Sequence, residues 1–271
     1  MRKIAANYIF PVSSTPLKNG IIVLDEKNYI VDIIDTKGEI KEIQNLEFYS
    51  GLIVPGFIDV FTLLNFSSFS KKDFENCLHA NFGSALRENL LHKPTTPETI
   101  QRGINQLEAY GTVAAVDFYF KNTLVEQKQK SRITFSDINL SLRSSSLQIP
   151  SIGAQFKREE SILLNRLILE NRTDFKPLES EMNRYCVGTG SLGTHLKLSV
   201  FDELKALQGL LPEFTFWELI KWGTINGAKH LQIEKEFGSI EIGKKPGLNL
   251  LTNLDYPNQK FSANSELKVL V

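Results

Sequence analysis

Short apolar runs separated by turn residues fill the first fifty positions of the chain. Turns are indicated at Lys18-Asn19-Gly20 and Asp25–Asn28, and the apolar runs lie at Tyr8–Phe10, Ile21–Leu24 and Tyr29–Ile34. This pattern is typical of strands in a small antiparallel sheet. It returns near the C-terminus, where Gly238–Gly243 and Pro246-Gly247 separate short predicted strands that extend to Leu251. Both ends of the chain are therefore predicted to be rich in β structure.

Helical and apolar segments alternate between the two ends. The clearest helix is predicted over 97–110, because Thr96 is a suitable N-cap and Pro97 occupies the first helical position. Gly111 is predicted to end this helix. Its buried stripe consists of Ile100, Ile104 and Leu107. The helix leads into a predicted strand at Val113–Val116.

The same alternation continues toward the C-terminus. Further predicted elements are a strand at Ile133–Leu140 after the polar segment Glu126–Lys130, a helix at Leu198–Leu211, and a helix that starts with the capping box of Thr215 and Glu218. The run Ile162–Leu169 is compatible with a helix or a strand, and the pattern assigns no structure to most of Ser144–Met182. Alternating helices and strands favour a parallel sheet or a barrel.

Composition narrows the class of protein. The chain has 31 basic and 31 acidic residues, so its formal net charge is zero, which argues against a nucleic-acid partner. No apolar run is long enough for a membrane-spanning helix, and the N-terminus has no secretory pattern. We therefore expect a cytoplasmic protein without a membrane partner. The two cysteines make no disulfide framework, and both are expected to be reduced.

Four segments, in chain order, resemble one known family. Gly51-Leu52-Ile53-Val54-Pro55-Gly56-Phe57-Ile58-Asp59 resembles the entry into the first barrel strand of the amidohydrolase superfamily, in its branch of cytosine deaminases and chlorohydrolases. The other three segments are Gly188–Leu192 with Leu198–Leu204, Thr224–Lys229, and Gly238–Ile240 with Gly243–Lys245. Within the family, the aminodeoxyfutalosine-deaminase-like group is the most similar. Residues 122–184 match the family pattern poorly.

The resemblance implies a (β/α)8 barrel of the TIM type and a small β-sandwich formed by both termini. The sandwich is expected to comprise 1–54 and 238–271, and the barrel 55–237. This barrel segment is shorter than the roughly 200 residues of the smallest barrels, so one or more βα units are predicted to be absent. A truncated or degenerate barrel exposes strand edges that need a cover. We therefore expect a homodimer.

The resemblance also identifies the positions where the family holds a divalent metal. Two histidines of a His-x-His pair correspond to Phe61 and Leu63, and a metal-binding, proton-shuttling aspartate corresponds to Gly190. A metal that activates water needs three or four N, O or S ligands, and these three residue types supply none. The chain has four histidines, and none forms an H-x-H or H-x-x-x-H pair. The sequence therefore predicts no metal and no other cofactor.

Four polar residues are candidates for ligand binding at the barrel mouth: Asp59, Asn65, Asp117 and His195. The alternative for Asp59 is a structural hydrogen-bonding role at a strand end, and the alternative for His195 is a solvated loop position. Structural roles are also favoured for several other conspicuous residues, namely His79, His92, His230, Trp217 and Trp222. Gly243–Gly247 is predicted to be a turn, because it lacks the spacing of a phosphate-binding loop.

Three hypotheses of function follow. The first is a non-catalytic relative of the amidohydrolases with a binding or assembly role, in which Phe61 and Leu63 pack the mouth shut. The second is a metal-free enzyme or small-molecule binder that uses the mouth residues. The third is a metal-dependent deaminase with displaced ligands, for which His79, His92, His195 and the cysteines Cys77 and Cys186 are the available donors.

Overall fold

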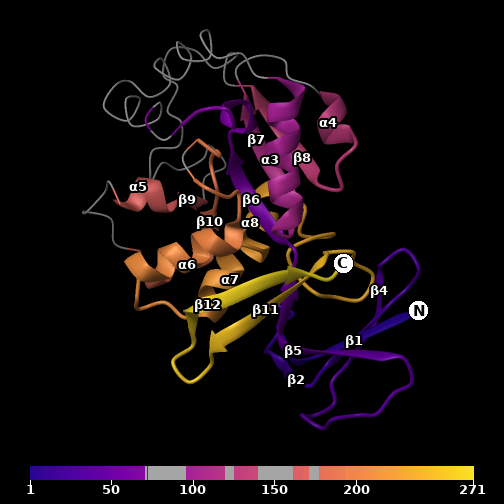
Figure 1. Cartoon of the computed structure of the whole chain (residues 1–271). Coiled ribbons are helices and arrows are strands. Elements are labelled where there is room, and N and C mark those ends of the chain that lie inside the picture. The colour runs from indigo at the N-terminus through magenta and orange to yellow at the C-terminus, as the bar shows by residue number, and fades with distance from the viewer. Residues whose placement is uncertain (71, 73–95, 120–124, 140–160, 171–176, 194) are drawn as a thin grey trace.

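The computed structural model describes residues 1–70, 72, 96–119, 125–139, 161–170, 177–193 and 195–271 (Figure 1). Its strands are β1 (Arg2–Ile9), β2 (Leu17–Lys18), β3 (Ile21–Leu24), β4 (Ile30–Ile34), β5 (Leu46–Pro55), β6 (Phe57–Thr62), β7 (Thr112–Tyr119), β8 (Thr134–Asn139), β9 (Ile162–Leu164), β10 (Tyr185–Val187), β11 (Leu248–Asp255) and β12 (Lys260–Val269). The helices are η1 (Leu64–Phe66), α3 (Pro97–Ala109), α4 (Val125–Gln129), α5 (Arg166–Glu170), η3 (Glu179–Glu181), α6 (Val200–Leu210), α7 (Phe216–Trp222) and α8 (Ile225–Leu231).

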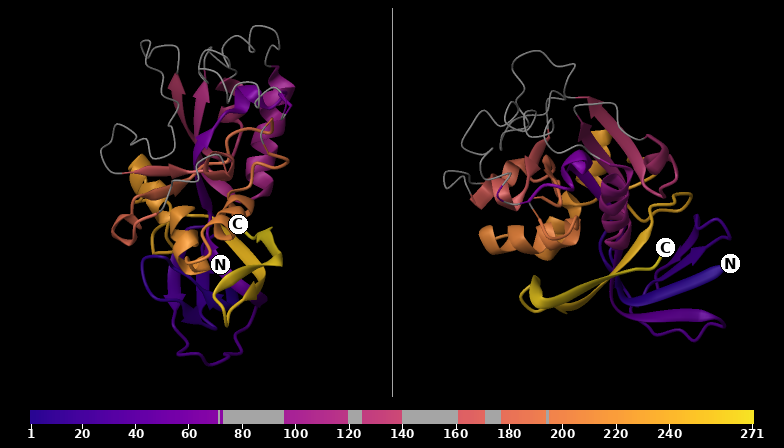
Figure 2. Two further views of the ribbon diagram at one scale, coloured as in Figure 1. Left: turned by 90° about the vertical axis from the view of Figure 1, so that its left-hand side faces the viewer. Right: turned by 45° about the horizontal axis from the view of Figure 1, so that its top comes forward.

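Strands from both ends of the chain form one seven-stranded sheet. Its order is β12-β11-β5-β1-β3-β4. β2 pairs with residues 8 and 9 of β1, beyond the residues of β1 that pair with β3. In Figure 2 the two termini lie beside each other on this sheet. The prediction of a purely antiparallel N-terminal sheet was wrong, because β1 and β5 run parallel. The chain crosses from β4 at one edge to the far side of β1 before β5 starts, and no local turn signal reports such a crossing.

The C-terminal strands extend further than the sequence predicted. Residues 238–242 form no strand, as expected for a segment that separates strands, and Gly238 has a φ of +83°, which suits a turn. The strands after this turn are longer than predicted, because β11 and β12 form a hairpin that extends past Leu251. β11 then pairs antiparallel with β5, so that residue 54 lies opposite residue 249. This pairing joins the two ends of the chain.

Five further strands are parallel to one another. β6, β7 and β8 form one sheet, and β9 and β10 form a second. The two sheets meet at a parallel bridge between Thr62 and Gly190. Across this junction the N–H of Leu63 donates to Gly190 O at 2.7 Å, and the N–H of Gly190 donates to Phe61 O at 2.8 Å. The spatial order among the described strands is therefore β8-β7-β6-β10-β9.

Local signals predicted the principal helices well. Thr96 Oγ1 accepts from the N–H of Thr99 at the start of α3, and the predicted stripe of this helix is buried. α6 starts at Val200 rather than at Leu198, because Ser199 caps it. The polar segment 126–130 is mostly helical, in α4 (Val125–Gln129), and Lys128 within it is buried. The ambiguous run 162–169 contains both structures, β9 and then α5.

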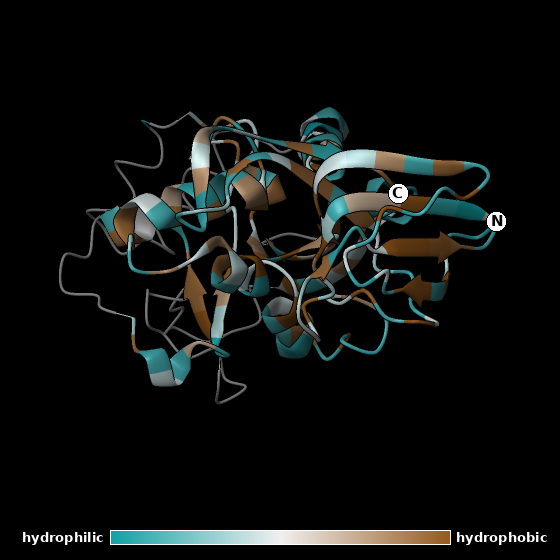
Figure 3. Ribbon diagram, turned by 90° about the horizontal axis from the view of Figure 1, so that it is seen from below, coloured by the Kyte–Doolittle hydropathy of each residue, from teal (hydrophilic) through white to brown (hydrophobic). Residues whose placement is uncertain are grey.

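Apolar side chains pack on both faces of the parallel strands. On the face that we call the inner face, Ala114, Val116 and Phe118 of β7 pack in one cluster with Leu163 and Cys186. On the opposite, outer face, alternate residues of β9 and β10 pack against α6 and α7, and Ala115 packs against α3. Figure 3 shows the apolar colour of strands near the middle of the molecule. No helix in the described part of the chain is long and apolar enough to cross a membrane.

The capping box at α7 gives a direct test of the fold. The backbone N–H of Thr215 donates to Glu218 Oε2 at 2.7 Å, and Thr215 Oγ1 accepts from the N–H of Glu218. We expect Thr215→Ala to lower the free energy of unfolding by about 1 kcal/mol, because the amide of Glu218 loses its partner. Urea denaturation measures the change. The control is Thr15→Ala, at an exposed position outside any helix, and an equal loss in both variants would contradict the assignment.

Candidate functional site

The positions that correspond to the family's metal ligands lie on the inner face of the β6–β10 junction. Phe61 and Leu63 are 5% and 2% exposed, and both belong to the inner apolar cluster. The ring of Phe61 lies 5.2 Å from that of Phe118, centroid to centroid. A Cβ atom at Gly188 would come within 2.4 Å of Phe61 Cβ and 2.9 Å of Phe61 N, so only glycine allows the backbone of β6 to approach this closely. The glycine therefore permits the close contact of β6 with the end of β10.

The buried apolar side chains of the inner face form one cluster. It consists of Ile58, Val60, Phe61, Leu63, Phe66, Phe69, Ala114, Val116, Phe118, Leu163, Cys186 and Ala228. Cys186 carries the only sulfur in this set, and burial raises the pKa of its thiol to about 12. A thiol with such a pKa stays protonated at neutral pH and is a poor metal ligand. This face can pack side chains, but it offers no set of converging donors.

Asp59 points to the outer face instead. In the register of β6 and β7 it lies opposite Ala115, which packs against α3. Its carboxylate accepts three hydrogen bonds: from Thr189 Oγ1 at 2.6 Å, from the N–H of Thr189 at 3.1 Å and from the N–H of Phe61 at 3.2 Å. The carboxylate is completely buried. It holds the segment after β10 against the end of β6, which is the structural role considered for it from the sequence.

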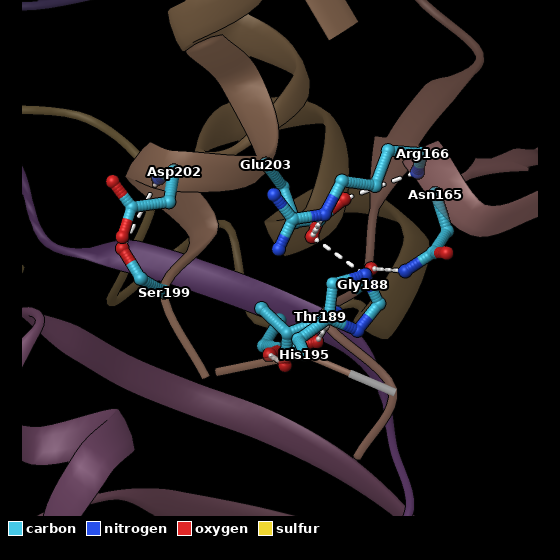
Figure 4. Close-up of polar contacts among 9 residues, drawn as sticks. Asn165, Arg166, Gly188, Thr189, His195, Ser199, Asp202 and Glu203 are labelled. Atoms are coloured by element: carbon cyan, nitrogen blue, oxygen red, sulfur yellow. Dashed lines mark hydrogen bonds and ion pairs between the residues drawn. The ribbon is translucent and has the colours of Figure 1, made fainter. Parts of the chain in front are cut away.

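His195 is buried and in contact with an acid, so the alternative of a solvated loop histidine was wrong. Its Nε2 lies 3.1 Å from Glu203 Oε1, and the side chains of both residues are at most 3% exposed. Arg166 Nε lies 3.1 Å from the same oxygen, and the backbone N–H of Arg166 donates to Glu203 Oε2. Figure 4 shows the imidazole and the guanidinium directed toward this carboxylate. His195 lies in a loop, but its side chain is buried against Glu203, which α6 directs toward it.

Burial dominates the ionisation of these groups. It raises the pKa of Asp59 to about 7 and that of Glu203 to about 7, although the hydrogen bonds of Thr189 and the charge of Arg166 act in the opposite direction. Burial also lowers the pKa of His195 to about 3, and the positive charge of Arg166 adds to this effect. His195 is therefore neutral at neutral pH, while the two carboxyl groups are close to half protonated.

Asp117 also lies on the outer face, where it belongs to a second polar group. Its Oδ1 accepts from the N–H of Leu64 at 2.9 Å, and its Oδ2 lies 2.6 Å from Lys128 Nζ. Lys128 is buried as well and forms a second ion pair with Asp137. Burial raises the pKa of Asp117, and the charge of Lys128 opposes that shift. The group ties α4 to strands β7 and β8.

Asn65 and His230 also lie within the described residues. Asn65 is 2% exposed within η1, at the end of β6. Cys77, His79 and His92 lie outside the described residues. His230 occupies the last turn of α8, as predicted. Among the residues that the structure describes, no three His, Cys, Asp or Glu side chains gather in a way that could hold a metal ion.

Sequence reasoning missed five members of the outer polar groups: Thr189, Arg166, Glu203, Lys128 and Asp137. Glu203 carried a usable signal, because it lies on the stripe of α6 that also contains Val200 and Leu207. A glutamate on an otherwise apolar helix face needs a buried partner. Its partners come from separate parts of the chain, so the sequence could indicate the need for a partner but not its identity.

The polar groups of the outer face are occupied by protein partners. Asp59 is held by Thr189 and Phe61, and Glu203 by Arg166 and His195. Asn165 Nδ2 similarly donates to Gly188 O at 2.6 Å. None of three cavities of about 490, 690 and 550 Å³ is lined by these residues. The arrangement is suited to holding loops and helices together rather than to receiving a substrate.

Comparison with known proteins relates the chain to one family. Residues 212–270 match the Amidohydrolase family. A stretch of 94 residues is 32% identical to 5-methylthioadenosine/S-adenosylhomocysteine deaminase of Thermoanaerobacter pseudethanolicus; the match covers 31% of this chain and 22% of that enzyme. The chain thus matches only about a fifth of the length of this relative.

Solved structures share the fold. Aminofutalosine deaminase of Helicobacter pylori, in complex with methylthio-coformycin, superposes with a TM-score of 0.56 and 17% identity, over 97% of this chain and 94% of that one. Atrazine chlorohydrolase of Arthrobacter aurescens, complexed with zinc, superposes with a TM-score of 0.59 and 10% identity, over 99% and 92% of the two chains. These matches give a mixed α/β fold of the TIM-barrel type.

The raised pKa of Asp59 predicts a pH-dependent stability. Below about pH 4 the carboxyl group is protonated in both the folded and the unfolded chain. Between about pH 4 and pH 7 the unfolded chain has released this proton while the folded chain still holds it, so the free energy of unfolding falls as the pH rises. The stability that the protonated group contributes is therefore lost once the pH has passed about 7. We expect Asp59→Asn to be more stable, relative to the natural protein, at pH 8 than at pH 5.

Urea denaturation of both proteins at the two pH values measures this difference. His195 acts with the opposite sign, because its lowered pKa costs stability as the pH falls below about 6.5, but it is present in both proteins and cancels. Glu39→Gln, at an exposed position, is the control and should show no change with pH. An equal stability difference at pH 5 and pH 8 would refute the prediction.

Proposed function

The chain belongs to the amidohydrolase superfamily, in its deaminase and chlorohydrolase-like branch, and from this premise we propose that it is a non-catalytic member with a binding or assembly role. The observation that carries the proposal is the packing at the family's metal positions. There Phe61 and Leu63 are buried in the inner apolar cluster, and Gly190 bonds only through its backbone in the junction with β6.

The divalent metal that the family implies does not fit the described residues. A benzyl group, an isobutyl group and a glycine offer no lone pair to a cation, and the cluster around them adds only a protonated thiol. Replacing ligands by packed apolar groups removes the water-activating site and stabilises the β6–β10 junction. No hydrolytic step is therefore derived for this chain.

We further propose that the fold is a truncated barrel joined to a smaller β unit. The β unit comprises 1–54 and 238–271, and the barrel comprises 55–237. Supporting this division, β5 and β11 both belong to the terminal sheet, whereas β6 starts immediately after β5 and belongs to the parallel strands. The order β8-β7-β6-β10-β9 accounts for five described strands, fewer than the eight of a complete barrel.

The placement of the polar candidates argues against a ligand site at the mouth. Asp59 and Asp117 lie on the outer face, and His195 contacts Glu203. A metal-free enzyme would need some of these groups to face a cavity. A deaminase with displaced ligands would need at least three converging donors. The non-catalytic role requires neither, and it is the hypothesis that we favour.

Metal content tests the proposal most directly. For the purified protein without an affinity tag, elemental mass spectrometry is expected to find well below one zinc, iron or manganese per chain. Ammonia release from adenosine or 5′-methylthioadenosine should not exceed the rate without protein. One transition metal per chain, or turnover that a chelator abolishes, would overturn the proposal.

A variant that restores the three family residues provides the matched control. Phe61→His, Leu63→His and Gly190→Asp together place imidazoles and a carboxylate at the expected positions. We expect no deaminase activity after zinc is added, because the other ligands and the second shell of partners are still missing. Appreciable turnover would mean that the rest of a catalytic site is present in this chain.

We also propose that the protein is a homodimer in the cytoplasm. Among the described residues, β8 pairs only with β7 and β9 pairs only with β10, so each of these strands has one open edge. Open edges of parallel strands need a cover, and a second copy of the chain can supply one. Light scattering at micromolar concentration is expected to give twice the chain mass of 30.7 kDa. A stable monomer would contradict this proposal.

A further inference from the structure

A cavity of about 690 Å³ lies at the opposite end of the parallel strands from the Thr62–Gly190 junction. Its walls come from six separate parts of the chain. They are the turn between β3 and β4 with Asn28 and Tyr29, the end of α3 and start of β7 with Glu108 and Gly111–Val113, Arg132 before β8, the segment Lys235–Phe237 after α8, the loop Gly243–Gly247 before β11, and Val269 and Val271. The volume is within the usual range for sites that bind small organic molecules.

Backbone hydrogen bonds hold these walls in place. The N–H of Ile30 donates to Lys244 O at 2.9 Å, and the N–H of Gly243 donates to Ile30 O at 2.8 Å. Asp25 Oδ1 accepts from the N–H of Tyr29 and so fixes the turn that presents its ring. Because these contacts are formed in the protein alone, a ligand would meet a cavity whose shape is already set.

Positive charge exceeds negative charge around the cavity. Four basic side chains line it against two acidic ones: Arg132, Lys235, Lys244 and Lys245 against Glu108 and Glu236. Lys244 is engaged with Glu241 and with Ser239 Oγ. Glu108 is likewise engaged, through Ser131 Oγ and the backbone N–H of Arg132. The Arg132 side chain is 81% exposed, and its ion pair with Glu108 is long, at 3.9 Å. The guanidinium can therefore turn toward an anion.

An aromatic surface lies beside this charge. The ring of Tyr29 is half exposed, and Lys245 Nζ lies 6.0 Å from its centroid. Phe237 contributes a second ring to the lining. A flat ring can stack on Tyr29 while a negative group attached to it meets Lys245 or Arg132.

We propose that this cavity is a binding site for a small organic anion that carries a flat ring, such as an aryl phosphate. The site uses Arg132 and Lys245 for the anion and Tyr29 for the ring. None of its lining residues is a buried member of the inner apolar cluster, and it needs no metal. The inference therefore goes beyond the proposed non-catalytic role, and it would stand if that proposal failed.

Isothermal titration calorimetry with phenyl phosphate tests the site on the full chain. We expect saturable binding of one molecule per chain. The double variant Arg132→Ala, Lys245→Ala should weaken binding at least about tenfold, because two charge-assisted contacts are lost. Tyr29→Leu should weaken it as well, and the control Lys41→Ala, at an exposed position in another cavity, should leave it unchanged. Arg132, Lys245 and Tyr29 are exposed, so these changes spare the core.

Two reference compounds separate the contributions of charge and ring. Phenol lacks the phosphate and inorganic phosphate lacks the ring, and both should bind at least about tenfold more weakly than phenyl phosphate. Absence of saturable binding of phenyl phosphate, or equal binding by the double variant, would overturn the proposal. Equal affinity for either reference compound would also overturn it, because the site would then recognise only one of the two groups.

Discussion

The junction between β6 and β10 is the contact on which the rest of the structure depends. Backbone hydrogen bonds connect residues 61 and 63 with Gly190, although more than a hundred residues separate them in sequence. Gly188 lets the backbone of Phe61 approach closely, and on the outer face Asp59 receives the hydrogen bonds of Thr189. The two sheets of parallel strands are joined here, so loss of this contact would separate β6–β8 from β9 and β10.

Under the proposed non-catalytic role, the same junction lets the scaffold persist while the metal site is replaced. Strand pairing uses backbone hydrogen bonds, and these do not require a particular side chain at residue 61, 63 or 190. Side chains on the inner face then determine whether the space holds a metal or a packed core. In this chain the inner face is apolar, and the charged groups lie on the outer face with protein partners. Burial of Asp59 and Glu203 costs stability above about pH 7, and the network around them offsets part of that cost.

Much of the secondary structure could be predicted from neighbouring residues. The cap at Thr96, the stripe of α3 and the capping box of α7 act within one or two helical turns, so a local pattern suffices. The parallel pairing of β1 with β5 and the hairpin of β11 and β12 could not be found this way, because pairing partners are chosen by the whole sheet. The burial of His195 was missed for the same reason, since it depends on Glu203 from the following helix and on Arg166 from an earlier one.

The sequence by itself determined the types of side chain at the family positions, and therefore that Phe61, Leu63 and Gly190 supply no metal ligand. It also determined the helices, because capping and apolar periodicity are local. Only the tertiary structure decided which face each polar group occupies: the register shift in β6 between Asp59 and Thr62 is a property of strand pairing. It likewise decided where the cavity with Tyr29, Arg132 and Lys245 forms, because those residues meet only when distant segments of the chain pack together.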